Sequence, residues 1–134
     1  MPQMYIPTGV ETTVKFKTEI VDAAGAYNPA TGVYTVPSDG AGIYLVIAKV
    51  QWPNGQAGVA GKTRNLHICV NGSPYAQGIF FATGNGQESF LNQMLVSLTA
   101  GSTISIKIYH NESGAIELDP DSNACMLTIT RLKK

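Results

Sequence analysis

Carboxylate and amide side chains recur at every second position near the end of the sequence, a pattern that could supply oxygen ligands to Ca²⁺. The four residues are Glu117, Asp119, Asp121 and Asn123. The segment lacks the central glycine and the final glutamate of an EF-hand loop. Pro120 and its polar neighbours favour a solvated turn. We therefore predict a turn without a bound metal, with a calcium site at Glu117–Asn123 as the alternative.

The other patterns that suggest catalysis are incomplete. The glycine-rich segment 55–63 ends like a phosphate-binding P-loop, but Gln56 stands where that motif requires its first glycine. His67 and His110 have no further histidine or cysteine at metal-ligand spacing. No serine or cysteine lies in the sequence context of an activated nucleophile. We therefore predict a protein that is not an enzyme and carries no cofactor.

Composition excludes several classes of partner. The chain has 134 residues, 13% of them charged, and nine basic residues balance nine acidic ones. This length predicts one domain. Zero net charge offers no clustered positive surface for nucleic acid or an anionic membrane, no apolar run could span a bilayer, and no signal peptide is expected. Cys69 and Cys125 lie in apolar runs, which predicts buried free thiols rather than a disulfide.

Short apolar runs separated by glycine and proline turns indicate an all-β sandwich. Residues 14–21 and 103–110 alternate between apolar and polar side chains, whereas 43–52 is apolar at nearly every position. Asn71-Gly72 predicts a tight hairpin turn. The apolar spacing in 88–98 fits a helix slightly better than a strand, but the surrounding sheet pattern leaves little room for a helix, so we predict a strand. The other predicted strands are 33–37, 66–70 and 125–132.

One long pattern resembles a known family. Residues 27–34 read YNPATGVY, and Pro37 and Gly42-Ile43-Tyr44 follow at the spacing found in C1q/TNF-like jelly rolls. Further similar pieces, such as LHICVNG at 66–72, follow in the same order, so the resemblance covers roughly residues 14 to 132. It implies a sandwich of two five-stranded antiparallel sheets that assembles as a homotrimer. Departures from the family pattern occur at Ser102, Ala124 and Met126.

The resemblance places the jelly roll at residues 14–134 and leaves 1–13 as an N-terminal arm, or a segment that docks onto a protein partner. A strand that is apolar on both faces also predicts an interface by itself, because large exposed apolar patches mark contact sites. We expect aromatic residues and methionine near a shared trimer axis. The candidates are Tyr44, Val46, Met94 and Tyr109. Burial inside the core of a single chain remains the alternative for each.

Three loops, 51–64, 81–88 and 111–123, are predicted to carry the function, which is expected to be binding of a cell-surface glycan or a protein receptor. The candidate ligand residues in them are Arg64, Asn85, Asn111, Glu112, Glu117, Asp119 and Asp121. We expect a non-enzymatic head domain of a virion, either a phage capsid decoration or a tail or fibre tip.

Alternative functions and settings stay open. A lectin-like carbohydrate-binding module is the first. A glycoside-acting enzyme with Glu117 and Asp119 as paired carboxylates is the second. An extracellular or cell-surface location is the alternative to the virion.

Overall fold

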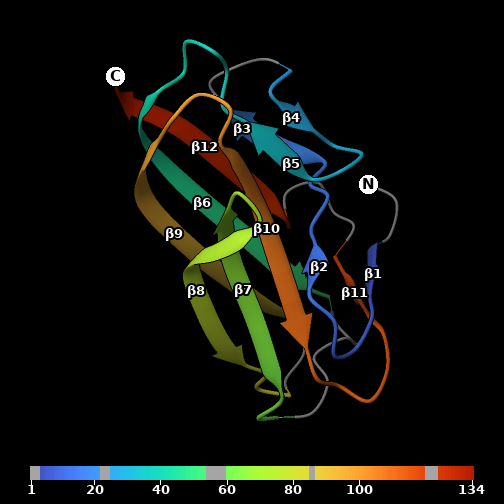
Figure 1. The fold of residues 1–134 in the computed structure, drawn as a ribbon. Helices are drawn as coiled ribbons and strands as arrows, with labels where there is room; N and C mark the ends of the chain where they lie inside the picture. Colours follow the sequence, from blue (N-terminus) through green and yellow to red (C-terminus); the bar gives the residue numbers. More distant parts are fainter. Residues whose placement is uncertain (1–3, 22–24, 54–59, 85–86, 120–123) are drawn as a thin grey trace.

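A computed structural model describes residues 4–21, 25–53, 60–84, 87–119 and 124–134, and regular structure in these ranges consists of strands (Figure 1). The shorter ones are β1 (Met4–Ile6), β2 (Thr12–Thr13), β3 (Thr18–Val21), β4 (Tyr27–Asn28), β5 (Val33–Thr35) and β11 (Ile116–Leu118). The longer ones are β6 (Gly42–Trp52), β7 (Thr63–Val70), β8 (Ser73–Phe81), β9 (Glu88–Leu98), β10 (Thr103–His110) and β12 (Met126–Lys133). The described ranges hold no helix of the length and hydropathy needed to traverse a membrane.

The strands form two large sheets and one small one. One large sheet has the order β4-β5-β10-β7-β8, with β2 also on β10, and the other has the order β3-β12-β6-β9. Figure 1 shows these two layers, with the small β1-β11 pair beside them. The predicted two-sheet sandwich is therefore confirmed, although the sheets hold six and four strands rather than five each.

Strand pairing is antiparallel except at one place. Strand β12 lies between β3 and β6, antiparallel to β6 and parallel to β3. Strands β3 and β12 are far apart in sequence, so no tight turn dictates their relative direction. The expectation of purely antiparallel sheets is wrong for this pair alone among the described strands.

The segment 88–98 forms a strand, as predicted. It pairs with β6 over its whole length, from Trp52 opposite Glu88 to Gly42 opposite Leu98. Its side chains alternate in the strand period: Met94 and Val96 are buried, whereas Leu95 between them is exposed. Pairing with a long neighbour outweighs the helical spacing of its apolar residues.

Two turns follow the sequence signals closely. Asn71 and Gly72 have φ values of 51° and 83° between β7 and β8, the positive pair that a type I′ turn requires. At the β4–β5 turn, the Asn28 carbonyl accepts from the Gly32 amide at 2.8 Å and the Asn28 side chain accepts from the Ala30 amide at 2.9 Å. Gly32 has φ 77°, and a Cβ there would lie 2.5 Å from the Val14 carbonyl oxygen, so the motif requires glycine.

The core fills the space between the two large sheets, and three of the four predicted interface residues belong to it. Tyr44, Val46 and Met94 are buried within the single chain. Tyr44 also stacks edge-on against Tyr34 with 6.5 Å between the ring centroids. These residues cannot line a trimer axis as exposed side chains, so the intramolecular alternative holds for them. Tyr109 is half-buried on the outward-facing parity of β10.

Both cysteines behave as predicted. Cys69 and Cys125 are buried and free, and burial raises the pKa of each thiol. The structure therefore confirms buried thiols that are not bridged to each other.

The first described residues lie on the chain's own sheets. Strand β1 pairs with β11, with Tyr5 opposite Glu117, and β2 pairs with β10, with Thr13 opposite Lys107. Residues 4–6 and 12–13 are therefore part of the fold of this chain. Strand pairing continues on the N-terminal side of the predicted domain boundary after residue 13.

Candidate functional site

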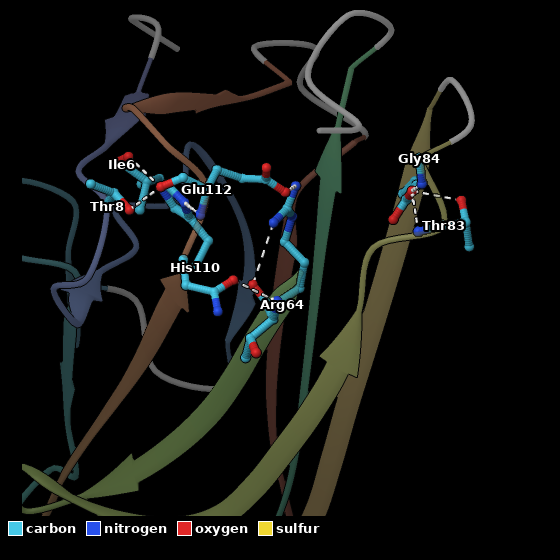
Figure 2. Close-up of polar contacts among 10 residues, drawn as sticks. Ile6, Thr8, Arg64, Thr83, Gly84, His110 and Glu112 are labelled. Atoms are coloured by element: carbon cyan, nitrogen blue, oxygen red, sulfur yellow. Dashed lines mark hydrogen bonds and ion pairs between the residues drawn. The ribbon is translucent and has the colours of Figure 1, made fainter. Parts of the chain in front are cut away.

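A buried ion pair lies at the end of the sandwich where β7 begins and β10 ends. Arg64 is opposite His110 in the β7–β10 register, and Glu112 follows two residues later. The Arg64 Nη2 atom lies 2.7 Å from Glu112 Oε2, and the two side chains are 1% and 6% exposed (Figure 2). Arg64 and Glu112 were expected to be ligand residues on two separate loops. The structure corrects that expectation, because each neutralises the other beneath the surface.

An aromatic ring, Trp52, lies against this ion pair, and a second ring, His110, packs on Trp52. The Arg64 guanidinium carbon lies 5.3 Å from the centroid of the Trp52 ring, within range of a cation–π interaction. The Trp52 ring meets His110 edge-on at 6.1 Å. The face of the Trp52 ring and the Glu112 carboxylate thus replace the water that the buried guanidinium no longer contacts.

His110 completes the cluster through both ring nitrogens. Its Nε2 atom lies 2.7 Å from the Ile6 carbonyl oxygen, and the Glu112 amide donates to Nδ1 at 3.2 Å (Figure 2). A carbonyl only accepts, so Nε2 carries the proton and Nδ1 accepts, which describes a neutral imidazole. Burial lowers the pKa of His110 first, and the Arg64 charge lowers it further, whereas the Ile6 hydrogen bond and Glu112 act in the opposite direction.

A second buried carboxylate closes the connection between β8 and β9. Glu88 Oε1 accepts from the Thr83 amide at 2.8 Å, the Thr83 hydroxyl at 2.7 Å and the Gly84 amide at 3.2 Å (Figure 2). Glu88 is 8% exposed. Sequence reasoning missed this role, although Glu88 shares its strand parity with buried Met94, which was a usable signal.

The remaining ligand candidates have separate surroundings. Asp119 Oδ2 accepts from the side-chain amides of Gln51, at 2.9 Å, and Gln87, at 3.4 Å. Asn111 is exposed, and its side-chain oxygen accepts from the Thr63 amide at 2.8 Å. These bonds connect the loop ends to the strands that flank them.

Several candidates bear on the calcium and glycoside alternatives. Glu117 is half-buried on β11. Asn85, Asp121 and Asn123 lie outside the described residues. Within the ranges that the structure describes, no three or more His, Cys, Asp and Glu residues are grouped as a metal would need. The predictions about these loop residues as ligands remain predictions.

Apolar side chains gather on the outer side of the β6–β9 pair, next to Lys49 and Gln93 on the same side. Leu95 lies directly opposite Leu45 in the register, Leu91 lies four pairs further along, opposite Lys49, and Leu95 and Leu91 are 62% and 50% exposed. Leu45 and Ile47 are half-buried on the same side of β6. We call Leu45, Ile47, Leu91 and Leu95 the apolar face.

Three of the predicted interface residues, Tyr44, Val46 and Met94, lie on the opposite side of the sheet from the apolar face. In β6 every even-numbered residue from Tyr44 to Trp52 is apolar, whereas the odd-numbered set includes Lys49 and Gln51. Lys49 and Gln51 indicate that the odd-numbered side of β6 faces solvent, and Leu45 and Ile47 lie on that same side. A second group of exposed apolar side chains, Tyr75, Ile79 and Phe81, lies along the edge strand β8.

Comparison with known proteins agrees with this fold. The family model described as "C1q domain" matches residues 3–125, and the chain belongs to that family. No curated protein sequence matches the chain significantly.

Among solved structures, the chain is similar to two proteins at low sequence identity. The globular domain of zebrafish complement 1qA protein has 13% sequence identity and a TM-score of 0.49, over 88% of this chain and 93% of that one. A CBM35 module from Cellvibrio japonicus Abf62 has 11% identity and a TM-score of 0.36, over 95% of this chain and 93% of that one.

Proposed function

We propose that this C1q domain is a non-enzymatic head that assembles as a homotrimer through the apolar face. C1q domains are typically trimeric globular heads. The observation that carries the proposal is the pairing of Leu45 with Leu95 on the outer side of β6 and the edge strand β9, with Ile47 and Leu91 around them. Fully burying a leucine side chain contributes about 1.5–3 kcal/mol, so covering this face with identical copies is favourable.

The buried carboxylates support a binding role over catalysis. Glu112 neutralises Arg64, and Glu88 accepts three hydrogen bonds from the turn at Thr83 and Gly84. Both groups hold the ends of predicted functional loops in place. A rigid base beneath variable loops is an arrangement typical of binding modules, and three copies of such loops on one body increase avidity by orders of magnitude.

Mass measurement tests the assembly. We expect sedimentation or light scattering at micromolar concentration to give the mass of three chains, and Leu95→Glu to give that of one, because the substitution places a charge in the centre of the contact. Val10→Glu, at a residue that is 53% exposed and away from this face, is the matched control and should remain trimeric. A monomeric unsubstituted chain would overturn the proposed assembly.

The biological setting that we propose is a virion, in which the trimer acts as a capsid decoration or a tail or fibre tip and the loops at 81–88 and 111–123 bind a surface receptor. The 134 residues contain no Gly-X-Y repeat, and the proposed contact between the copies is therefore the apolar face. Purified particles should contain the protein in stoichiometric amounts. Its absence from particles would exclude this setting without affecting the trimer.

A further inference from the structure

The N-terminal segment, defined here as residues 4–10, is attached to the end of β10 and to the turn that follows it by three hydrogen bonds. His110 Nε2 lies 2.7 Å from the Ile6 carbonyl oxygen, and the Gly9 amide donates to the His110 carbonyl at 2.9 Å. The Thr8 hydroxyl donates to the carbonyl of Glu112 (Figure 2). The fully buried side chain of His110 therefore lies where the N-terminal segment meets the turn that carries the ion pair.

The bonding of His110 is compatible with the neutral ring only. A second proton would bind at Nδ1, which already accepts from the Glu112 amide at 3.2 Å. Two N–H groups would then face each other, and the amide would lose its acceptor. Protonation also adds a positive charge in a buried site where Arg64 is already positive.

The groups around the ring do not compensate for this charge. From β7 the facing group is the Arg64 guanidinium, and from the turn after β10 it is the Glu112 carboxylate, which is already engaged by Arg64 at 2.7 Å. From β6 the ring meets Trp52, which is uncharged. Strands β1 and β11 carry the titratable residues Tyr5 and Glu117. Both alternate along their strands with buried residues such as Ile6, so their side chains project away from the buried side of the two strands.

We propose that His110 is a pH-sensitive clasp, whose protonation in mildly acidic solution releases the N-terminal segment while the sandwich stays folded. The release is local because β1 has three residues and pairs with β11 outside the two large sheets, whereas β6, β7, β9, β10 and β12 pair over long stretches. Burial lowers the pKa of His110, which also disfavours a second proton on the clasped ring.

Linkage gives the size of the effect. A released, solvated imidazole has a pKa of about 6.5. Because the clasped form resists protonation, the released form binds more protons below this pH, and acid favours release. Between about pH 7.5 and about pH 5.5, the equilibrium constant for opening should therefore increase roughly tenfold, provided that the clasped ring stays neutral.

Hydrogen exchange on the full-length chain tests the proposal. Exchange by mass spectrometry at both pH values, corrected for the intrinsic rates, should show roughly tenfold lower protection of residues 4–10 in acid, with β6 and β9 unchanged. The variant His110→Gln should lose this pH dependence. His67→Gln is the matched control and should retain the pH dependence. His67 lies on the side of β7 opposite to Arg64, with its Nε2 atom 3.9 Å from Glu11 Oε1.

A direct titration keeps the proposal testable if His110→Gln does not fold. The chain has two histidines, so NMR can follow both rings in the unsubstituted protein. We expect the His110 signal to change only together with release of residues 4–10. Titration of His110 near its ordinary pKa while residues 4–10 stay protected would overturn the proposal, and so would equal pH dependence in His110→Gln.

Discussion

Replacing Glu112 by glutamine tests the buried ion pair, because the substitution keeps the shape of the side chain and removes its charge. The Arg64 guanidinium, 1% exposed, would then remain buried without a carboxylate. The Trp52 ring at 5.3 Å offsets only part of this loss, since a cation–π contact contributes about 2 kcal/mol when desolvated. Breaking one partner of a buried pair typically costs about 3–5 kcal/mol. We expect a loss in that range for Glu112→Gln.

Urea unfolding monitored by Trp52 fluorescence measures this loss, at pH 7 and at a fixed protomer concentration, since subunit association shifts apparent stability. The midpoint should fall with an unchanged slope. The double variant Arg64→Met, Glu112→Leu removes both charges and should recover most of the stability, because apolar replacements of a buried pair are often neutral. Asp39→Asn, at an exposed acidic residue, is the matched control and should change stability by less than about 0.5 kcal/mol.

The outcome that would refute the reasoning is a small effect. If Glu112→Gln cost less than about 1 kcal/mol, in the range measured for surface ion pairs, the Arg64 guanidinium would have access to water. The ion pair would then not be the rigid base of the loops.

Two further predictions concern Glu88 and the cysteines. Glu88→Gln should destabilise the protein by about 1–3 kcal/mol, because charge-assisted hydrogen bonds to the turn are lost, and hydrogen exchange should become faster at Thr83 and Gly84. Burial keeps Cys69 and Cys125 protonated by raising the pKa of each thiol, so neither should react with a thiol reagent near pH 8 until the chain is unfolded; labelling of the native protein would contradict this.

The strand order follows less directly from the sequence than the strands themselves. Alternation and turn residues were sufficient for most strands, and Asn71-Gly72 identified a hairpin correctly. The segment 88–98 shows the limit of local patterns, since its apolar spacing fits a helix and only the long pairing with β6 makes it a strand. The parallel contact of β3 with β12 is a long-range choice that no local signal encodes.

The candidate site was predictable only in part. The outward-facing leucines of the apolar face could have been identified from Lys49 and Gln51, which share their parity. The meeting of Arg64, Glu112 and His110 could not, because it depends on the β7–β10 register. Residues that looked like separate polar loop positions thus became one buried cluster.

The position of β12 has a consequence for how this domain forms. Among these residues it is the last strand in chain order, yet it lies in the middle of its sheet, between β3 and β6. During synthesis, β3 and β6 therefore cannot reach their final pairing until β12 has been made. Such late, long-range closure slows folding and leaves unsatisfied strand edges exposed. Nascent chains of this domain are accordingly candidates for chaperone binding up to the moment that β12 inserts.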